Sequence, residues 1–119
     1  MTISSEPVEA SQIKFGADGL LPTICQHYET GQVLVQAFMN KDSFQKTLEL
    51  GQAVFWSRSR KEMWHKGATS GNYLNVRSIR VNCENNSLLI LCDPVGRTCH
   101  TGQDSCFFRN LDWRPPPIN

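Results

Sequence analysis

Hydrophobic residues along the first half of this chain predict a strand followed by a helix. Val33 to Phe38 is an apolar run with the length of a buried strand. Phe44 and Leu48, four positions apart, would share one face of a helix. Asn40 favours the N-terminal cap of such a helix, and Gly51 favours the residue that follows its last turn. We therefore expect a helix over 41–50.

The second half of the chain predicts more β-structure. Ala53 to Ser57 has the pattern of a strand, and Leu74 to Val81 has that of another in which the alternation slips, as at a β-bulge. Asn85-Asn86-Ser87 is a turn signal, and Leu88 to Cys92 returns as a buried strand. The last two strands would form a hairpin that turns just after Cys83. The expected fold is α+β and mostly β, a small mixed-sheet domain with one clear helix.

Length and composition fit a single compact domain. The chain has 119 residues, of which 39% are hydrophobic, enough for one core but not for two. We expect a flexible N-terminal arm over 1–12, a domain over 13–113 and a Pro-rich tail over 114–119. The net charge of +1 and the absence of a long apolar run predict no nucleic-acid partner and no membrane partner. The first ten residues lack the features of a signal peptide, so a cytoplasmic location is expected.

The five cysteines fall into two groups by their surroundings. Cys25 and Cys92 lie beside apolar residues and are interpreted as core residues. Cys83, Cys99 and Cys106 lie in polar segments. An odd count without signs of export favours a metal site or chemistry over disulfides. Three cysteine ligands would leave the fourth position of a catalytic zinc ion to water. However, no Cys-x-x-Cys pair is present, so small buried cysteines remain an alternative.

Two histidines are candidates for proton transfer at such a site. Three thiolates would give the zinc centre a net charge of −1, so the metal would acidify water less than one held by neutral histidines. A protein base should therefore assist. His100 adjoins Cys99, and His65 lies in a polar segment. His27 lies near an expected strand and is interpreted as a surface histidine.

A basic segment offers binding groups for a flat, phosphorylated ligand. Five of the twelve Lys and Arg residues fall between Arg58 and Arg77. Guanidinium groups and hydroxyls bind phosphate, and indole rings stack on bases. The candidate binding residues, which combine these groups, are Trp56, Arg58, Arg60, Trp64, Lys66, Thr69 and Ser70. A solvated basic loop is the alternative, and the low net charge argues against an extended RNA-binding track.

Taken together, these segments resemble the phosphoribosyl-AMP cyclohydrolase family of histidine biosynthesis. The similarity covers about residues 15 to 109 and combines the strand end, the basic segment and the cysteine loop. In chain order the matching segments are Ala37-Phe38-Met39-Asn40, Trp56-Ser57-Arg58-Ser59-Arg60, Trp64-His65-Lys66-Gly67, Thr69-Ser70-Gly71, Cys99-His100-Thr101-Gly102 and Ser105-Cys106-Phe107.

The resemblance implies a hydrolase that opens the adenine ring of N1-(5-phosphoribosyl)-AMP at the N1–C6 bond. It also implies an intertwined homodimer whose zinc ions are held by Cys83, Cys99 and Cys106, with ligands from both subunits. Substitution at N1 makes C6 electrophilic, so water attacks C6 with help from His65 or His100. The cations at 58, 60 and 66 would hold phosphates, and an indole ring at 56 or 64 would stack on the purine.

The residues around Cys83 depart from the family pattern. The family holds Mg²⁺ in an Asp-Cys-Asp-x-Asp segment, whereas this chain has Asn82-Cys83-Glu84-Asn85-Asn86. Amide oxygens bring no charge, so a magnesium site made of Asn82, Glu84 and Asn86 should bind weakly, or not at all without substrate phosphates. If this segment is extended, the three side chains share one face and Cys83 points to the other. A zinc site could then persist without magnesium.

These departures leave two interpretations open. The chain is either a working cyclohydrolase with a relaxed magnesium requirement, or a divergent paralogue. The paralogue would act on another purine nucleotide, or would be a non-catalytic, zinc-stapled dimer that binds a nucleotide. His27, where family members usually have an acidic residue, is a further departure. Nucleobase deaminases also direct water at a purine C6, but their His-x-Glu and Pro-Cys-x-x-Cys motifs are absent here.

Overall fold

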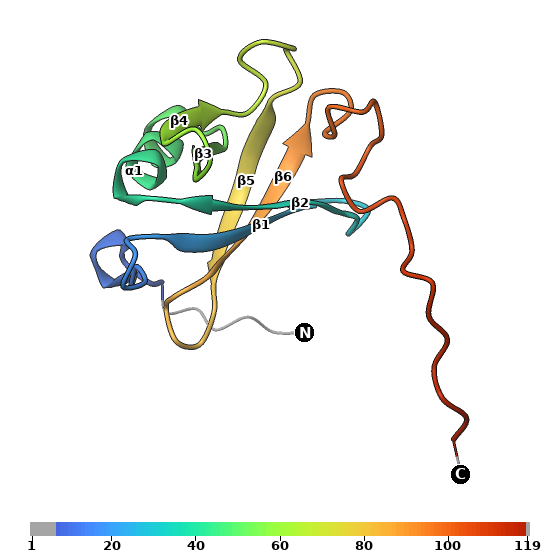
Figure 1. Cartoon of the computed structure of the whole chain (residues 1–119). Coiled ribbons are helices and arrows are strands. Elements are labelled where there is room, and N and C mark those ends of the chain that lie inside the picture. The colour runs from blue at the N-terminus through green and yellow to red at the C-terminus, as the bar shows by residue number, and fades with distance from the viewer. Residues whose placement is uncertain (1–6, 119) are drawn as a thin grey trace.

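The computed structural model describes residues 7–118, which are built around a four-stranded mixed sheet (Figure 1). The strands of this sheet are β1 (Leu21–His27), β2 (Val33–Met39), β5 (Leu74–Val81) and β6 (Leu88–Pro94), and their spatial order is β2-β1-β6-β5. β1 and β6 run parallel, and the other neighbours are antiparallel. The predicted α+β, mostly β fold is confirmed.

The smaller elements lie at one end of this sheet. β3 (Val54–Ser57) and β4 (Glu62–His65) form a two-stranded antiparallel sheet. They follow α1 (Lys41–Leu50), and α1 contacts both β2 and β3. A short 3₁₀ turn, η1 (Ala10–Gln12), lies within the predicted N-terminal arm, whose first six residues fall outside the described part.

The helix over 41–50 has the predicted ends. The side-chain oxygen of Asn40 accepts a hydrogen bond from the Ser43 backbone N–H at 2.8 Å, and Gly51 ends the helix in the left-handed conformation with φ 68°. The buried face includes Phe44 and Thr47. The Thr47 hydroxyl accepts a hydrogen bond from the Val54 backbone N–H at 3.0 Å and so joins the helix to β3. This contact fixes the position of the β3–β4 sheet.

The strands of the second half also agree with the sequence, but two strands of the structure, β1 and β4, were not predicted. The predicted slip in β5 occurs between Val76 and Ser78, where the pairing with β6 changes register. β1 was not predicted, because Pro22 and the small buried Thr23 hide its alternation. β4 was not predicted either, because it is polar and mostly exposed.

The core lies between the four-stranded sheet, α1 and β3. Its buried residues include Leu21, Leu34, Met39, Phe55, Leu74, Leu88 and Ile90. Cys25 and Cys92 are fully buried, as predicted. A hydrogen bond with Cys92 and burial together raise the pKa of the Cys25 thiol, which therefore stays neutral. Both cysteines act as small core residues.

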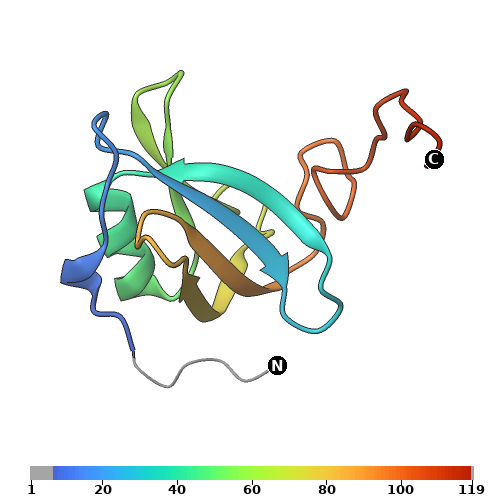
Figure 2. The same ribbon diagram turned by 90° about the horizontal axis from the view of Figure 1, so that it is seen from below.

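The chain after β6 returns to β2 before it runs away from the domain (Figure 2). The Ser105 hydroxyl donates to the Val33 carbonyl at 2.6 Å, and the Cys106 N–H donates to the Leu34 carbonyl at 2.8 Å. Beyond this anchor the described residues have no regular secondary structure, and Trp113 is 66% exposed. Among residues 7–118 the only α-helix is too short to span a membrane.

Candidate functional site

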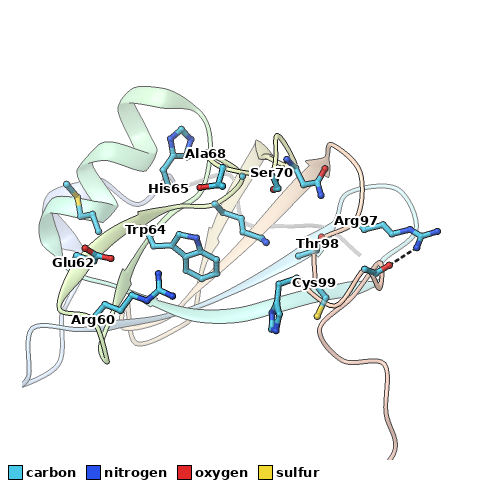
Figure 3. A pocket seen from close by; sticks show the side chains of 16 residues that line it. Arg60, Glu62, Trp64, His65, Ala68, Ser70, Arg97, Thr98 and Cys99 are labelled. Atoms are coloured by element: carbon cyan, nitrogen blue, oxygen red, sulfur yellow. Dashed lines mark hydrogen bonds between the residues drawn. The ribbon is translucent and has the colours of Figure 1, made fainter.

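A cavity of about 860 Å³ opens between β4, the turn that follows it and the loop after β6 (Figure 3). Five of the predicted ligand-binding residues border it, together with both candidate histidines and one candidate zinc ligand. These residues are Arg60, Trp64, Lys66, Thr69, Ser70, His65, His100 and Cys99. The fold thus joins the basic segment to the cysteine loop, as the predicted site requires.

The other two predicted binding residues lie in a neighbouring hollow of about 540 Å³. Trp56 and Arg58 border this hollow, and the Arg58 guanidinium lies 4.1 Å from the centre of the Phe38 ring. Trp64 lines both cavities. The predicted binding set is therefore divided into two adjoining chambers that share one indole.

Lys66 is the most enclosed cation of the main cavity. The residue is only 8% exposed, and its ammonium group lies 5.4 Å from the centre of the Trp64 ring. No carboxylate pairs with it among the described residues. The next residue, Gly67, has φ 94°, and a Cβ there would lie 2.5 Å from the Tyr73 nitrogen, so only glycine allows this close turn. A buried cation without an anionic partner favours an anionic ligand.

Cys99 lines this cavity and its thiol contacts that of Cys106, which borders a separate hollow. Hydrogen bonds from Thr101, whose hydroxyl lies 3.0 Å from the sulfur, lower the pKa of the Cys99 thiol. The Cys106 thiol and the Lys66 charge lower it further, against the effect of burial. Burial and then the neighbouring Cys99 raise the pKa of Cys106. Cys99 is therefore the first of the pair to become a thiolate, the form that binds metals.

Cys83 lies far from this pair. It is exposed in the turn between β5 and β6, whereas the Cys99 loop follows the opposite end of β6 (Figure 1). Seven strand residues separate these ends by roughly 20 Å. The three predicted zinc ligands do not meet within one chain, and residues 7–118 contain no group of three His, Cys, Asp or Glu residues that could hold a metal.

The segment around Cys83 is a turn, so the condition of an extended segment is not met, and the hairpin turn includes Cys83 instead of beginning just after it. β5 ends at Val81, and Cys83 lies within the turn rather than at the end of the strand. The Asn82 side-chain oxygen accepts hydrogen bonds from the backbone N–H groups of Asn86, at 2.9 Å, and Ser87, at 3.0 Å. These local bonds compete with the strand and close the turn. Asn82, Glu84 and Asn86 therefore do not present three side chains on one strand face.

The two candidate histidines differ in their hydrogen bonds. His65 Nε2 lies 2.9 Å from Gln52 Oε1, and an amide oxygen only accepts, so this nitrogen carries a proton. Figure 3 shows His65 and Trp64 leaving β4 on opposite sides, as neighbours in a strand do. His100 is exposed in the loop next to Cys99 and makes no side-chain hydrogen bond with another described residue. His100 and Trp64 also line a smaller hollow of about 410 Å³.

Three residues of the site were missed in the sequence. Gln52 orients His65, and its own amide nitrogen donates to Asn75 Oδ1 at 3.1 Å. Arg97 lines the cavity and donates to the Gly102 carbonyl at 2.8 Å. Thr98 lines it as well, is only 1% exposed, and its hydroxyl has no hydrogen-bond partner among the described residues. Only its position at the start of a polar run distinguished Thr98 in the sequence.

Comparison with known proteins gives one consistent family. The model of the family "Phosphoribosyl-AMP cyclohydrolase" matches residues 35–108, a range that contains both chambers and all three candidate zinc ligands. A phosphoribosyl-AMP cyclohydrolase of Desulfatibacillum aliphaticivorans is 55% identical over 95 residues, which cover 79% of this chain and 76% of that protein. Its namesake from Streptococcus mutans is 52% identical over 93 residues, or 78% of this chain and 85% of that protein. Its namesake from Rhodospirillum centenum is 46% identical over 99 residues, or 83% and 74%.

The unpartnered hydroxyl of Thr98 predicts an unusual response to substitution. Thr98→Val should leave the free energy of unfolding unchanged or raise it, because the buried hydroxyl loses no hydrogen bond. The matched variant is Thr47→Val at an equally buried threonine, which should lower the free energy of unfolding by about 1–3 kcal/mol because the Val54 N–H loses its acceptor. Urea denaturation measures both values. An equal loss in the two variants would contradict this account of Thr98.

Proposed function

The chain belongs to the phosphoribosyl-AMP cyclohydrolase family, and on this basis we propose that it is a zinc-dependent enzyme that opens the adenine ring of N1-(5-phosphoribosyl)-AMP in histidine biosynthesis. Family membership makes the chain a hydrolase that acts on a C–N bond. The observation that carries the rest is the main cavity, which is lined by the Cys99 thiol, the indole ring of Trp64 and the buried cation Lys66, with Cys106 in contact with Cys99. This is a suitable site for a flat, anionic substrate beside a metal.

The residues proposed to hold zinc are Cys99 and Cys106 of one chain and Cys83 of a second copy. The lowered pKa of Cys99 and its contact with Cys106 support two of these ligands. The position of Cys83 at the far end of the hairpin supports its use by a partner, because it is exposed and beyond reach of its own chain's pair. Zinc held in this way would act as a Lewis acid and lower the pKa of water. Because the thiols must stay reduced, a cytoplasmic location is part of the proposal.

The two chambers suit the two ends of the substrate, which carries a phosphate on each of its two ribose groups. Lys66 and Arg60 bind one phosphate in the main cavity, which both residues line. Arg58 in the second hollow binds the other phosphate. The purine lies against Trp64, which lines both chambers. Thr69 and Ser70 border the main cavity and add donors.

His100 is the proposed base. It adjoins the proposed zinc ligand Cys99 and makes no side-chain hydrogen bond with another described residue, whereas the hydrogen bond of His65 Nε2 to Gln52 leaves only Nδ1 of that ring as an acceptor. The oxygen of water adds to C6 as His100 takes one proton from that water. The N1–C6 bond then breaks as the proton held by His100 passes to N1, and the remaining proton of the C6 hydroxyl leaves to solvent, so that C6 becomes a carboxamide. His65, held by Gln52, fixes the wall from which Trp64 projects.

The activity is tested by following purine ring opening in the ultraviolet with purified protein. We expect turnover with zinc as the only added metal, and its loss after zinc is removed with a chelator and the chelator is dialysed away. Added zinc should restore it. A zinc-loaded protein that binds the substrate without turnover would instead support the non-catalytic dimer, and full turnover without zinc would remove the metal from the proposal.

The assignment of the base is tested by substituting each histidine. His100→Ala should lower kcat by about 10²- to 10⁴-fold, the usual contribution of a general base, while the zinc content stays unchanged. Added imidazole should restore part of the lost rate. His65→Ala should retain most of kcat, because the His65 ring supports the cavity wall that carries Trp64 and does not take the proton. A small loss in His100→Ala with a large loss in His65→Ala would reverse the assignment.

A further inference from the structure

The turn that carries Cys83 is closed by the side-chain amides of two asparagines. Asn82 Nδ2 donates to Asn86 Oδ1 at 2.6 Å. Asn82 Oδ1 in turn accepts from the backbone N–H groups of Asn86 and Ser87, at 2.9 and 3.0 Å. Every polar atom of the Asn82 side chain thus has a partner inside the turn. We call this set of bonds the amide latch.

Two further hydrogen bonds fix the backbone of the turn, one from within it and one from outside it. The Asn85 N–H donates to the Asn82 carbonyl at 3.1 Å, and Asn85 has a positive φ of 59°, a conformation that asparagine tolerates well. The Asn85 carbonyl accepts a hydrogen bond from the Lys14 N–H at 2.7 Å, which ties the turn to the segment before β1. Cys83 is therefore exposed on a turn with a defined shape.

The magnesium ion that the family resemblance implies does not fit these residues. The side-chain oxygens of Asn82 and Asn86 already accept hydrogen bonds. The side-chain nitrogen of Asn82 is a hydrogen-bond donor within the turn and offers no lone pair to a cation. Only Glu84 offers a carboxylate, and one of its oxygens lies 3.4 Å from the Asn86 side-chain nitrogen. Magnesium requires a nearly octahedral shell of oxygen atoms and favours carboxylates. The latch would have to open before a cation could enter.

We propose that the amide latch replaces a divalent cation in this chain, and that Asn82 is a positioning residue that holds Cys83 ready to bind zinc. The inference rests on the proposed function, in which Cys83 is a zinc ligand. A ligand that is already ordered binds its metal more tightly than a mobile one, because less freedom is lost on binding. The neutral amides give this order without adding charge next to the zinc thiolates.

The test measures zinc affinity on the full chain by competition with a chromophoric chelator in magnesium-free buffer. Asn82→Ala should weaken zinc binding by about 10- to 100-fold, the usual effect of removing a partner that orients a metal ligand. Asn82→Asp keeps the acceptor for the two backbone N–H groups and should retain much of the affinity. Asn110→Ala, which removes an exposed amide from the C-terminal segment, is the matched control and should have no effect.

A second measurement uses the unchanged chain and does not depend on the folding of a variant. Millimolar Mg²⁺ should leave the zinc affinity of the wild type, and the thiolate absorption of its Co²⁺-substituted form, unaltered. Tighter zinc binding with Mg²⁺, or unchanged binding in Asn82→Ala, would overturn the latch. The Cys83→Ser variant distinguishes failure of the amide latch from failure of the proposed function. Unchanged zinc binding in that variant would show that Cys83 is not a zinc ligand.

Discussion

The rigidity of β6 is the constraint on which the proposed metal site depends. This strand is paired on both sides, with β1 and with β5, and its alternate side chains are buried in the core. It therefore holds the Cys83 turn and the Cys99 loop at opposite ends of one stiff hairpin. No loop movement within the chain brings the two ends together. A zinc site that uses all three cysteines consequently needs two copies of the chain.

The distribution of charge around the site follows from the same arrangement. The thiols of Cys99 and Cys106 lie on the side of the cavity near Lys66, whose charge favours the thiolate form of both. Within residues 7–118 the same cation has no carboxylate partner and can serve an anionic substrate. At the far end of the hairpin the turn is closed by neutral amides. The protein would thus offset the negative charge of a three-thiolate centre from the cavity side, and the amides that close the turn leave Glu84 as the only carboxylate there.

Much of the fold could be predicted because local signals agreed with one another. The helix over 41–50 had a cap, a period and a terminal glycine that pointed to the same limits. β1 escaped because Pro22 disfavours a strand and the polar Thr23 occupies a fully buried position, so that no apolar alternation is visible there. The hairpin turn was predicted just after Cys83, whereas the turn includes Cys83, because side-chain bonds of Asn82 close it. Such bonds depend on geometry that residue types alone do not specify.

The site shows the same limits. Clusters of residue types marked Lys66, Trp64 and Cys99, whereas Gln52 and Thr98 act through a single contact or its absence.

The sharing of the metal between chains is tested most directly by mixing two inactive variants, Cys83→Ser and Cys106→Ser, under conditions that exchange subunits. A shared site predicts recovery to about a quarter of the wild-type activity, because each mixed dimer contains one intact site. Two variants that stay inactive after exchange into mixed dimers would contradict a site built from two chains.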